Sequence, residues 1–227
     1  MCRVISLMGR SCSGKDTMLN NALKMCNYNE EKLMYLPLYT TRPQRPNEPE
    51  SAYNFVTDEE FKSLVDSGII FEYRTYKSHL NGSDDDIVYY GTGKPENMSS
   101  KREYISIGTK DTIQAFKNAF DEKNMSFVYI YASNKIITDR ACEREYGNRT
   151  QNYREMFRRL YEQYEQFRVF EKVIEKNTEI SMHVPCFVSN INGTEIFFIR
   201  NELYDINKTT KLMLDIVYGQ YQHLPRV

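Results

Sequence analysis

The chain of 227 residues lacks tryptophan, has only five cysteines and carries almost no net charge. Its cysteines form no Cys-x-x-Cys pair, which argues against a disulfide framework or a zinc site and favours a reducing, cytoplasmic compartment. The 30 basic residues nearly balance the 31 acidic ones, so composition gives no indication of a nucleic-acid or membrane surface. No apolar run approaches the roughly 18 residues that span a bilayer, and the first residues predict a strand rather than a signal peptide. The length suits one large α/β domain.

The most informative segment is the glycine-rich run G-R-S-C-S-G-K-D-T at residues 9–17. A short apolar run precedes it, and apolar residues recur at helical spacing after it. A glycine turn between a buried strand and a helix directs backbone N–H groups and the positive end of the helix dipole at one phosphate group. The plain alternative is a simple glycine turn that leaves its lysine as a surface charge. We predict an ATP-binding loop formed by Gly9, Ser11, Ser13, Gly14, Lys15, Asp16 and Thr17, with Lys15 against the β- and γ-phosphates.

The loop departs from the usual G-x-x-x-x-G-K-[Ser/Thr] pattern at its last position, where the chain has Asp16. Ser or Thr normally ligates Mg²⁺ at that position, and Thr17 follows directly, so either residue offers an oxygen ligand. A carboxylate is a hard oxygen ligand suited to this ion. We expect Asp16 or Thr17 to contact the Mg²⁺ that accompanies ATP, with Asp16 favoured by its position.

A second informative segment is the proline-stiffened stretch 40–55, in which Arg42 and Arg45 lie three residues apart and Tyr53 follows. Two guanidinium groups that converge on one place can each bind a phosphate dianion in a bidentate manner. Taken alone, these arginines fit a solvated basic loop at least as well.

Three later residues favour a binding site over a solvated loop. Glu72, on a predicted strand, is able to accept two hydrogen bonds from the edge of a base. The hydroxyl groups of Tyr90 and Thr92 are able to reach phosphate or base. We therefore predict that Arg42, Arg45, Tyr53, Glu72, Tyr90 and Thr92 form one acceptor site.

The rest of the chain alternates strand and helix patterns. Strand patterns cover residues 33–38, 69–73, 87–90, 104–107, 127–131, 186–189 and 196–199, the last two joined by a turn at Asn192-Gly193. Helices are expected after the capping box Thr57–Glu60, after Ser133 and at residues 206–217, and a long amphipathic helix is expected to bury Met156, Phe157, Leu160, Tyr161, Tyr164 and Phe167. Strands that alternate with helices after a phosphate loop predict an α/β fold of the P-loop NTPase type, a parallel sheet flanked by helices.

Four separate segments, in the same order, resemble the guanylate kinase family. They are the glycine-rich loop, T-T-R-P-Q-R-P followed by Y-N-F-V, the strand bearing Glu72 followed by Y-Y-G-T, and the later arginines followed by I-R-N-E at 199–202. The resemblance implies phosphoryl transfer from ATP to a nucleoside monophosphate, most simply GMP to GDP, with Mg²⁺ as cofactor and nucleotides as partners. It leaves the oligomeric state open.

The resemblance also implies a layout and individual roles. The core would comprise residues 1–36, 100–141 and 161–227, with a nucleoside-monophosphate-binding arm inserted at 37–99 and a lid at 142–160. In this scheme Arg42, Arg45, Tyr53 and Tyr90 hold the acceptor phosphate, Glu72 reads N1 and N2 of guanine with Thr92 nearby, and Arg140, Arg144 and Arg159 take the places of arginines that act with Lys15 in catalysis.

Three departures from the family pattern stand out. Leu38 occupies a place where the family has a serine that binds guanine, and Ser106 and Gly108 occupy the places of two aspartates. These changes bear on the preference for guanine more than on phosphoryl transfer. Asp16 is also found in ribose 1,5-bisphosphate phosphokinases, which makes such a small-molecule kinase the second hypothesis. A non-catalytic guanylate-kinase-like binding module is the third, and the intact Gly14-Lys15 argues against it.

Overall fold

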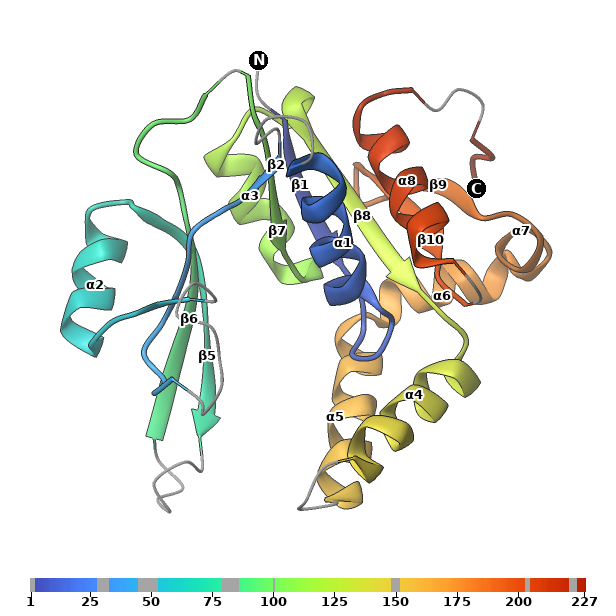
Figure 1. The fold of residues 1–227 in the computed structure, drawn as a ribbon, viewed down its shortest axis with the longest axis horizontal. Coiled ribbons are helices and arrows are strands. Elements are labelled where there is room, and N and C mark those ends of the chain that lie inside the picture. The colour runs from blue at the N-terminus through green and yellow to red at the C-terminus, as the bar shows by residue number, and fades with distance from the viewer. Residues whose placement is uncertain are drawn as a thin grey trace.

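The computed structural model describes residues 3–27, 33–44, 53–78, 86–99, 101–147, 152–202, 205–220 and 224–227. Its larger sheet contains β1 (Val4–Met8), β2 (Leu33–Tyr35), β7 (Glu103–Ile107), β8 (Met125–Tyr131), β9 (Cys186–Ile191) and β10 (Thr194–Arg200). The strand order is β2-β7-β1-β8-β10-β9, and every neighbouring pair is parallel except β10 with β9. The predicted α/β fold, with a parallel sheet flanked by helices, is confirmed (Figure 1).

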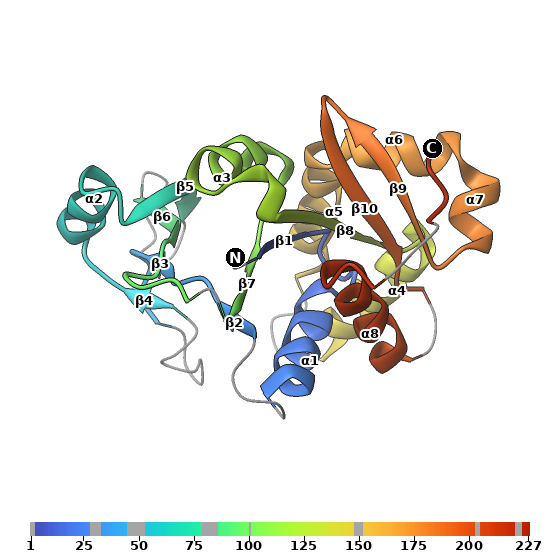
Figure 2. The same cartoon turned by 90° about the horizontal axis from the view of Figure 1, so that it is seen from above.

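Helices cover both faces of this sheet (Figure 2). The first layer is formed by α1 (Lys15–Asn27) and α8 (Ile206–Val217), and the second contains α3 (Ile113–Ala119), which follows a 3-10 turn at Lys110–Thr112, and α6 (Arg168–Lys176). The central strand β1 is buried along its whole length. Its residues Ile5 and Leu7 pack toward α1 and α8, while Val4 and Met8 pack toward α3 and α6. This alternation is the period of two that a strand buried on both faces requires.

A separate four-stranded sheet has the order β4-β3-β6-β5. Its strands are β3 (Leu38–Thr40), β4 (Asn54–Phe55), β5 (Ile70–Ser78) and β6 (Asp86–Gly93), and the helix α2 (Asp58–Asp66) lies on one face. The predicted capping box opens α2, with Thr57 and Glu60 each bonded to the other's backbone N–H. Phe61 of α2 packs so closely on β6 that a Cβ atom on Gly91 would lie 2.8 Å from its ring. The face opposite α2 is turned toward the larger sheet (Figure 1).

The chain crosses from the large sheet to the small one at Leu36-Pro37, where a single strand was expected. Leu36 N–H donates to the Ile105 carbonyl of the large sheet at 2.9 Å, whereas the Pro37 carbonyl accepts from Gly93 N–H of the small sheet at 2.8 Å. The prediction of one strand over residues 33–38 was therefore wrong. Pro37 has no N–H to continue a ladder, so the strand ends where the proline begins.

The helices α4 (Asn134–Tyr146) and α5 (Tyr153–Gln166) pack against each other beyond the carboxyl ends of β1 and β8 (Figure 1). The predicted burial of the α5 face was correct for Met156 and Leu160 but wrong for Phe157 and Tyr161, whose exposed fractions are 53% and 68%. The reason is that α5 contacts its neighbours along a narrow strip, and a residue one position further along the helix points about 100° away from it.

The carboxyl-terminal part of the chain folds largely as the sequence indicated. β9 and β10 form the expected hairpin, with positive φ angles of 51° at Asn192 and 79° at Gly193. The short helix α7 (Thr178–His183) precedes this hairpin, and α8 has the predicted limits. Within the described ranges, no helix combines the length and apolarity that crossing a membrane requires.

Candidate functional site

The glycine-rich loop connects β1 to α1 at the carboxyl end of the large sheet. Gly14 has a φ of +90° and Cys12 has a φ of +62°. Glycine adopts positive φ angles without strain, whereas other residues rarely adopt them. A Cβ atom on Gly9 would lie 2.7 Å from the Ile130 carbonyl oxygen, and one on Gly14 would overlap the side-chain amide of Asn201. Both glycines are therefore required by backbone geometry, as a loop that wraps a small group demands.

Two side chains fasten this loop from outside. Asn201, which follows β10 and is 8% exposed, donates from Nδ2 to the Ser13 carbonyl at 2.8 Å. Arg140 of α4 donates to the Cys12 carbonyl at 3.2 Å and to the Asn201 carbonyl at 3.0 Å. Arg140 was predicted to act on substrate, and the structure places its guanidinium on the loop backbone. The I-R-N-E segment pointed to Asn201, but its role needed the fold.

A buried network adds a further anchor that the sequence analysis did not identify. Arg10, within the loop, is 5% exposed and donates to Asn134 Oδ1 at 2.6 Å. Its Nη1 lies 3.5 Å from Oε2 of Glu171 on α6, while the Tyr129 hydroxyl donates to Oε1 of the same carboxylate at 2.5 Å. Burial raises the pKa of Glu171, and the Tyr129 hydroxyl and Arg10 act in the opposite direction. The signal in the sequence was a charged residue inside a glycine-rich turn.

Lys15, Asp16 and Thr17 form the first turn of α1. The Lys15 Nζ lies 3.2 Å from Asp16 Oδ2, and the Asp16 side chain is 66% exposed. Thr17 is also exposed. This carboxylate and this hydroxyl are thus accessible at the positive end of the helix dipole, where an anion is favoured.

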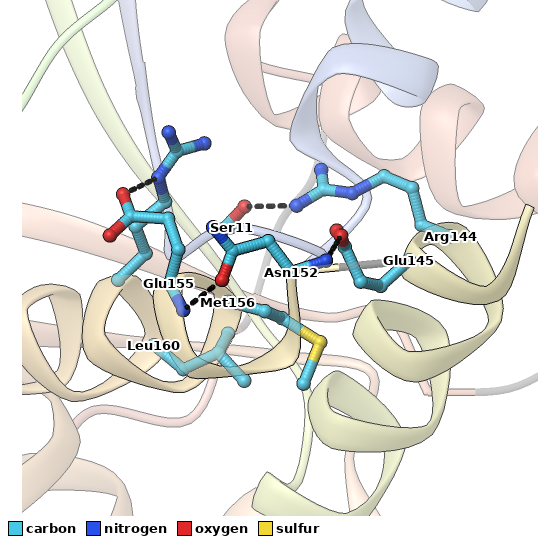
Figure 3. Close-up of a pocket in the computed structure, with 8 residues that line it drawn as sticks. Ser11, Arg144, Glu145, Asn152, Glu155, Met156 and Leu160 are labelled. Carbon is cyan, nitrogen blue, oxygen red and sulfur yellow. Dashed lines mark hydrogen bonds and ion pairs between the residues drawn. The ribbon is translucent and has the colours of Figure 1, made fainter. Parts of the chain in front are cut away.

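A cavity of about 250 Å³ opens between the loop and the pair α4–α5 (Figure 3). Arg144 and Arg159, both predicted site residues, line it together with Ser11 of the loop. Arg144 Nη2 lies 3.4 Å from the Ser11 hydroxyl, which accepts its hydrogen bond. Glu155 accepts hydrogen bonds from Arg158 and, at 2.6 Å, from Arg159 Nε, and these bonds, first that of Arg158, lower the pKa of Glu155 to about 2. The cavity therefore holds two guanidinium groups beside the glycine-rich loop.

The predicted acceptor residues gather on and beside the four-stranded sheet. Arg42 is 4% exposed, and its guanidinium carbon lies 5.1 Å from the ring centre of Tyr53, 5.5 Å from that of Phe55 and 6.0 Å from that of Tyr90. These rings fix the direction of the guanidinium group. Arg45, the second predicted phosphate ligand, lies outside the described residues.

Glu72 and Thr92 meet on neighbouring strands, as expected. The Thr92 hydroxyl donates to Glu72 Oε2 at 3.0 Å, and both side chains are buried. Arg74, which the sequence analysis overlooked, places its Nε 3.1 Å from Glu72 Oε1. Burial raises the pKa of Glu72, while Arg74 and then Thr92 counteract this effect. Because alternate residues of a strand share a face, the i+2 spacing of Glu72 and Arg74 was the available signal.

Tyr35, at the end of β2, lies within electrostatic reach of both groups. Burial is the main cause of a raised pKa at Tyr35, and the negative charge of Asp16 and then Tyr53 raise this pKa further. One of these neighbours belongs to the loop helix and the other to the acceptor group. Figure 1 likewise shows the four-stranded sheet facing the side of the large sheet where α1 begins. The structure thus brings the two predicted groups to opposite sides of one region.

The three unusual positions have clear surroundings. Leu38 of β3 is in register with Thr92, so it presents a hydrocarbon side chain in the row that contains Thr92 and Glu72. Ser106 is fully buried. A Cβ atom on Gly108 would overlap the hydroxyl of Ser6 and lie 2.9 Å from that of Thr112, so a larger residue would require these hydroxyl groups to move.

Comparison with known proteins agrees with this fold. The model of the guanylate kinase family matches residues 1–184. A guanylate kinase from Synechococcus sp. (strain JA-3-3Ab) is 32% identical over 88 residues, which cover 38% of this chain and 39% of that protein. The crystal structure of guanylate kinase from Anaplasma phagocytophilum shares the fold, with a TM-score of 0.53 and 16% identity over 98% of this chain and 87% of that one. Because the family model spans most of its residues, the chain belongs to the guanylate kinase family.

Proposed function

We propose that the chain transfers the γ-phosphoryl group of ATP to the phosphate of GMP, which gives ADP and GDP. The observation that supports this proposal is a glycine-rich loop with Lys15 on the side of the large sheet that the four-stranded sheet faces, with Tyr90 and Glu72 on that smaller sheet and Arg42 beside it. One side offers positive charge and backbone N–H groups to a triphosphate. The other offers a guanidinium to a monophosphate and a carboxylate to the donor edge of guanine.

On the ATP side, the proposed binding residues are Gly9, Ser11, Ser13, Gly14, Lys15, Asp16 and Thr17. The transferred phosphoryl group spreads negative charge over its oxygens in the transition state, so charge and position carry most of the catalysis. Lys15 would lie against the β- and γ-phosphates, and the cavity arginines Arg144 and Arg159 would offset charge on the moving group. Arg140 supports this indirectly, because its bonds to the loop carbonyls keep the loop in shape.

On the GMP side, the buried position of Arg42 suits a phosphate ligand whose direction is set in advance by Tyr53 and Tyr90. Arg45 belongs to the same proposed phosphate group. Glu72 would accept from N1 and N2 of guanine while the Thr92 hydroxyl, which donates to Oε2, fixes the orientation of the carboxylate. The acceptor phosphate then attacks in line with the bond that breaks to ADP.

Mg²⁺ fits the residues at the start of α1. Asp16 supplies an exposed carboxylate there, and this ion commonly takes one or two protein carboxylates together with substrate phosphates. When bound, Mg²⁺ would neutralise charge on the β- and γ-phosphates. Asp16, or Thr17 in its place, is the proposed protein ligand.

The same proposal includes a core, an acceptor arm near residues 37–99 and a lid near 142–160 that close on the substrates to exclude water. It also includes a cytoplasmic setting. The described cysteines Cys12, Cys26, Cys142 and Cys186 are all free thiols, which suits a reducing compartment.

A coupled ADP-release assay tests the proposal directly. Purified protein with ATP and Mg²⁺ is offered GMP, AMP, UMP and ribose 1,5-bisphosphate in separate reactions. Turnover with GMP at the highest kcat/KM supports the proposal. Phosphorylation of the sugar bisphosphate but of none of the nucleotides contradicts the proposal. So does the absence of phosphorylation with all four acceptors.

A further inference from the structure

Arg74 lies next to Glu72 on the face of the four-stranded sheet that is turned away from α2. The two residues are two positions apart on β5, so their side chains project from the same face. The cross-strand register pairs Glu72 with Thr92 and Arg74 with Tyr90. Arg74 therefore stands between a residue proposed to read the base and one proposed to hold the phosphate.

The Glu72 carboxylate is held from two sides. Thr92 donates to Oε2 at 3.0 Å, and Arg74 Nε lies 3.1 Å from Oε1. The Glu72 side chain is only 4% exposed, whereas that of Arg74 is 26% exposed. Neither Oε1 nor the Arg74 Nε has an aligned hydrogen-bond partner among the described residues, and both atoms are buried, so the pair is an electrostatic contact shielded from solvent.

The protonation state of this carboxylate decides which base it can read. Guanine offers two donors, N1–H and N2–H, and an ionised carboxylate accepts both. Adenine has an acceptor at N1, which a protonated carboxyl group can satisfy but a carboxylate cannot. Burial favours the protonated form of Glu72, and Arg74 is the largest influence in the other direction, ahead of Thr92.

Among the other neighbours that the structure describes, only Thr92 counteracts the effect of burial on Glu72, and it does so less than Arg74. From β6, Glu72 faces Thr92, with Tyr90 diagonally beside it, and Leu38 of β3 continues the row as a hydrocarbon. Arg74 is thus the cation that pairs directly with Glu72, whereas Arg42 lies over the ring of Tyr90. Its position on the strand makes it part of the acceptor site rather than of the outer surface.

We propose that Arg74 is a positioning residue that sets the base preference of the acceptor site through Glu72, by keeping its carboxylate ionised and oriented toward the donor edge of a 6-oxo-2-aminopurine. The inference rests on the proposed function, since it concerns the same acceptor site.

Arg74→Met removes the charge while keeping most of the side-chain length, and Arg74→Lys restores a charge. Arg168→Met is the matched control, because Arg168 also pairs with a glutamate but at the surface of α6, at 3.2 Å and 55% exposed. The kcat and KM values for GMP and AMP are measured at pH 6 and pH 8. Loss of an opposite charge this close raises a carboxyl pKa, and below the pKa the ionised fraction falls about tenfold for each unit by which the pH is lowered.

We expect Arg74→Met to raise the KM for GMP about tenfold at pH 6 and less at pH 8, with kcat changed less than about threefold. The KM for AMP should stay the same or fall, Arg74→Lys should recover most of the loss, and Arg168→Met should behave as the parent chain. An equal loss for GMP and AMP would assign Arg74 to the phosphate instead and overturn the inference. So would an unchanged KM for GMP at both pH values.

A second comparison tests whether Arg74 acts through Glu72. In a Glu72→Gln background the residue that titrates is absent, so adding Arg74→Met should change the kcat/KM for GMP less than about twofold. An undiminished loss in that background contradicts the proposal. Because the double variant removes both charges of the pair, the comparison of it with Glu72→Gln still tests the proposal if Arg74→Met alone does not fold.

Calorimetric titration with GMP in the same variants separates this inference from the proposed function. A chain that binds GMP with the expected dependence on Arg74 but does not phosphorylate it retains the inference and loses the proposed function. A parent chain that phosphorylates GMP while the variants match it retains the function and loses the inference. A chain that does not bind GMP overturns both.

Discussion

Replacement of Asn201 by alanine should loosen the glycine-rich loop without touching any group that contacts substrate in the proposed mechanism. The Asn201 amide donates to the Ser13 carbonyl at 2.8 Å and fills the space next to Gly14. The backbone bonds of Asn201, to the Tyr131 carbonyl and from Arg140, do not depend on its side chain. The substitution therefore removes one side-chain hydrogen bond and the packing beside Gly14, and leaves the backbone bonds in place.

The magnitude follows from that bond and from the carbonyl left behind. A neutral hydrogen bond contributes about 0.5–1.5 kcal/mol, and a buried group without a partner costs about 1–3 kcal/mol. In the Asn201→Ala variant the Ser13 carbonyl keeps a weaker contact with Arg140 Nη1 at 3.4 Å. The lower part of the range of about 1–3 kcal/mol for a group without a partner therefore applies. We expect a loss of about 1–2 kcal/mol in unfolding free energy, or about 2–8 °C in Tm for a chain of this size.

Thermal and urea unfolding, combined with steady-state kinetics, check this expectation. The KM for ATP should rise while the KM for GMP stays unchanged, because the loop lies on the ATP side. Asn118→Ala is the control: Asn118 is exposed on α3, where it accepts a surface bond from Gln114, and its loss should cost less than about 0.5 kcal/mol. Asn201→Asp keeps the size but loses the donor. If Asn201→Asp is as stable as the parent chain while Asn201→Ala is not, packing rather than the hydrogen bond holds the loop.

Four further predictions address the proposed roles. Lys15→Met should lower kcat at least about 100-fold with an unchanged fold by circular dichroism, and near-full turnover would exclude Lys15 from the ATP site. Asp16→Ala should raise the Mg²⁺ concentration needed for half-maximal rate more than Thr17→Ala does, and the opposite order would assign the metal to Thr17. Arg42→Ala should raise the KM for GMP, AMP and UMP alike, since phosphate carries no base information, and a loss confined to GMP would contradict this role. Burial raises the pKa of Glu72 above the ordinary 4.5, so the affinity for GMP, measured by calorimetric titration, should already fall at a pH above 4.5 as the solution is acidified. Glu72→Gln should show no such pH dependence of the affinity. A parent chain that keeps its full affinity for GMP down to pH 4.5 would refute this prediction.

Local patterns predicted much of the fold. The capping box at Thr57, the turn at Asn192-Gly193 and the limits of α8 all depend on residues close in sequence, and each was confirmed. The failures concern burial and the crossing between sheets. Exposure of Phe157 depends on what lies across from α5, and the break at Pro37 depends on two sheets competing for neighbouring backbone groups. A local sequence pattern shows neither the surface that lies across from α5 nor the second sheet that binds the backbone beyond Leu36.

The candidate site was predictable to the extent that its residues belong to compact motifs. The pairing of Glu72 with Thr92 brings together residues from two strands, and the structure confirms that they touch. Arg140 shows the limit of this reasoning. A guanidinium was expected near phosphate, yet it donates to loop carbonyls, because the backbone of a tight loop has acceptors that need partners. The sequence indicates that a charged side chain is present but not whether a backbone carbonyl group accepts its hydrogen bonds.

The unusual positions in and near the proposed acceptor site are linked in space to other residues. Ser6 and Thr112 fill the space beside Gly108, so an acidic side chain at position 108 is incompatible with the hydroxyl of Ser6 where it now lies. Leu38 removes a polar group from the row that contains Glu72, and Arg74 adds a charge on the far side of the same carboxylate. A site that loses neutral contacts to the base then depends more on the charged one, since hydrogen bonds to ionised groups are about twice as strong. Base preference in this chain should therefore rest on the ionisation of Glu72, which makes Arg74 more important here than in a site with several neutral readers.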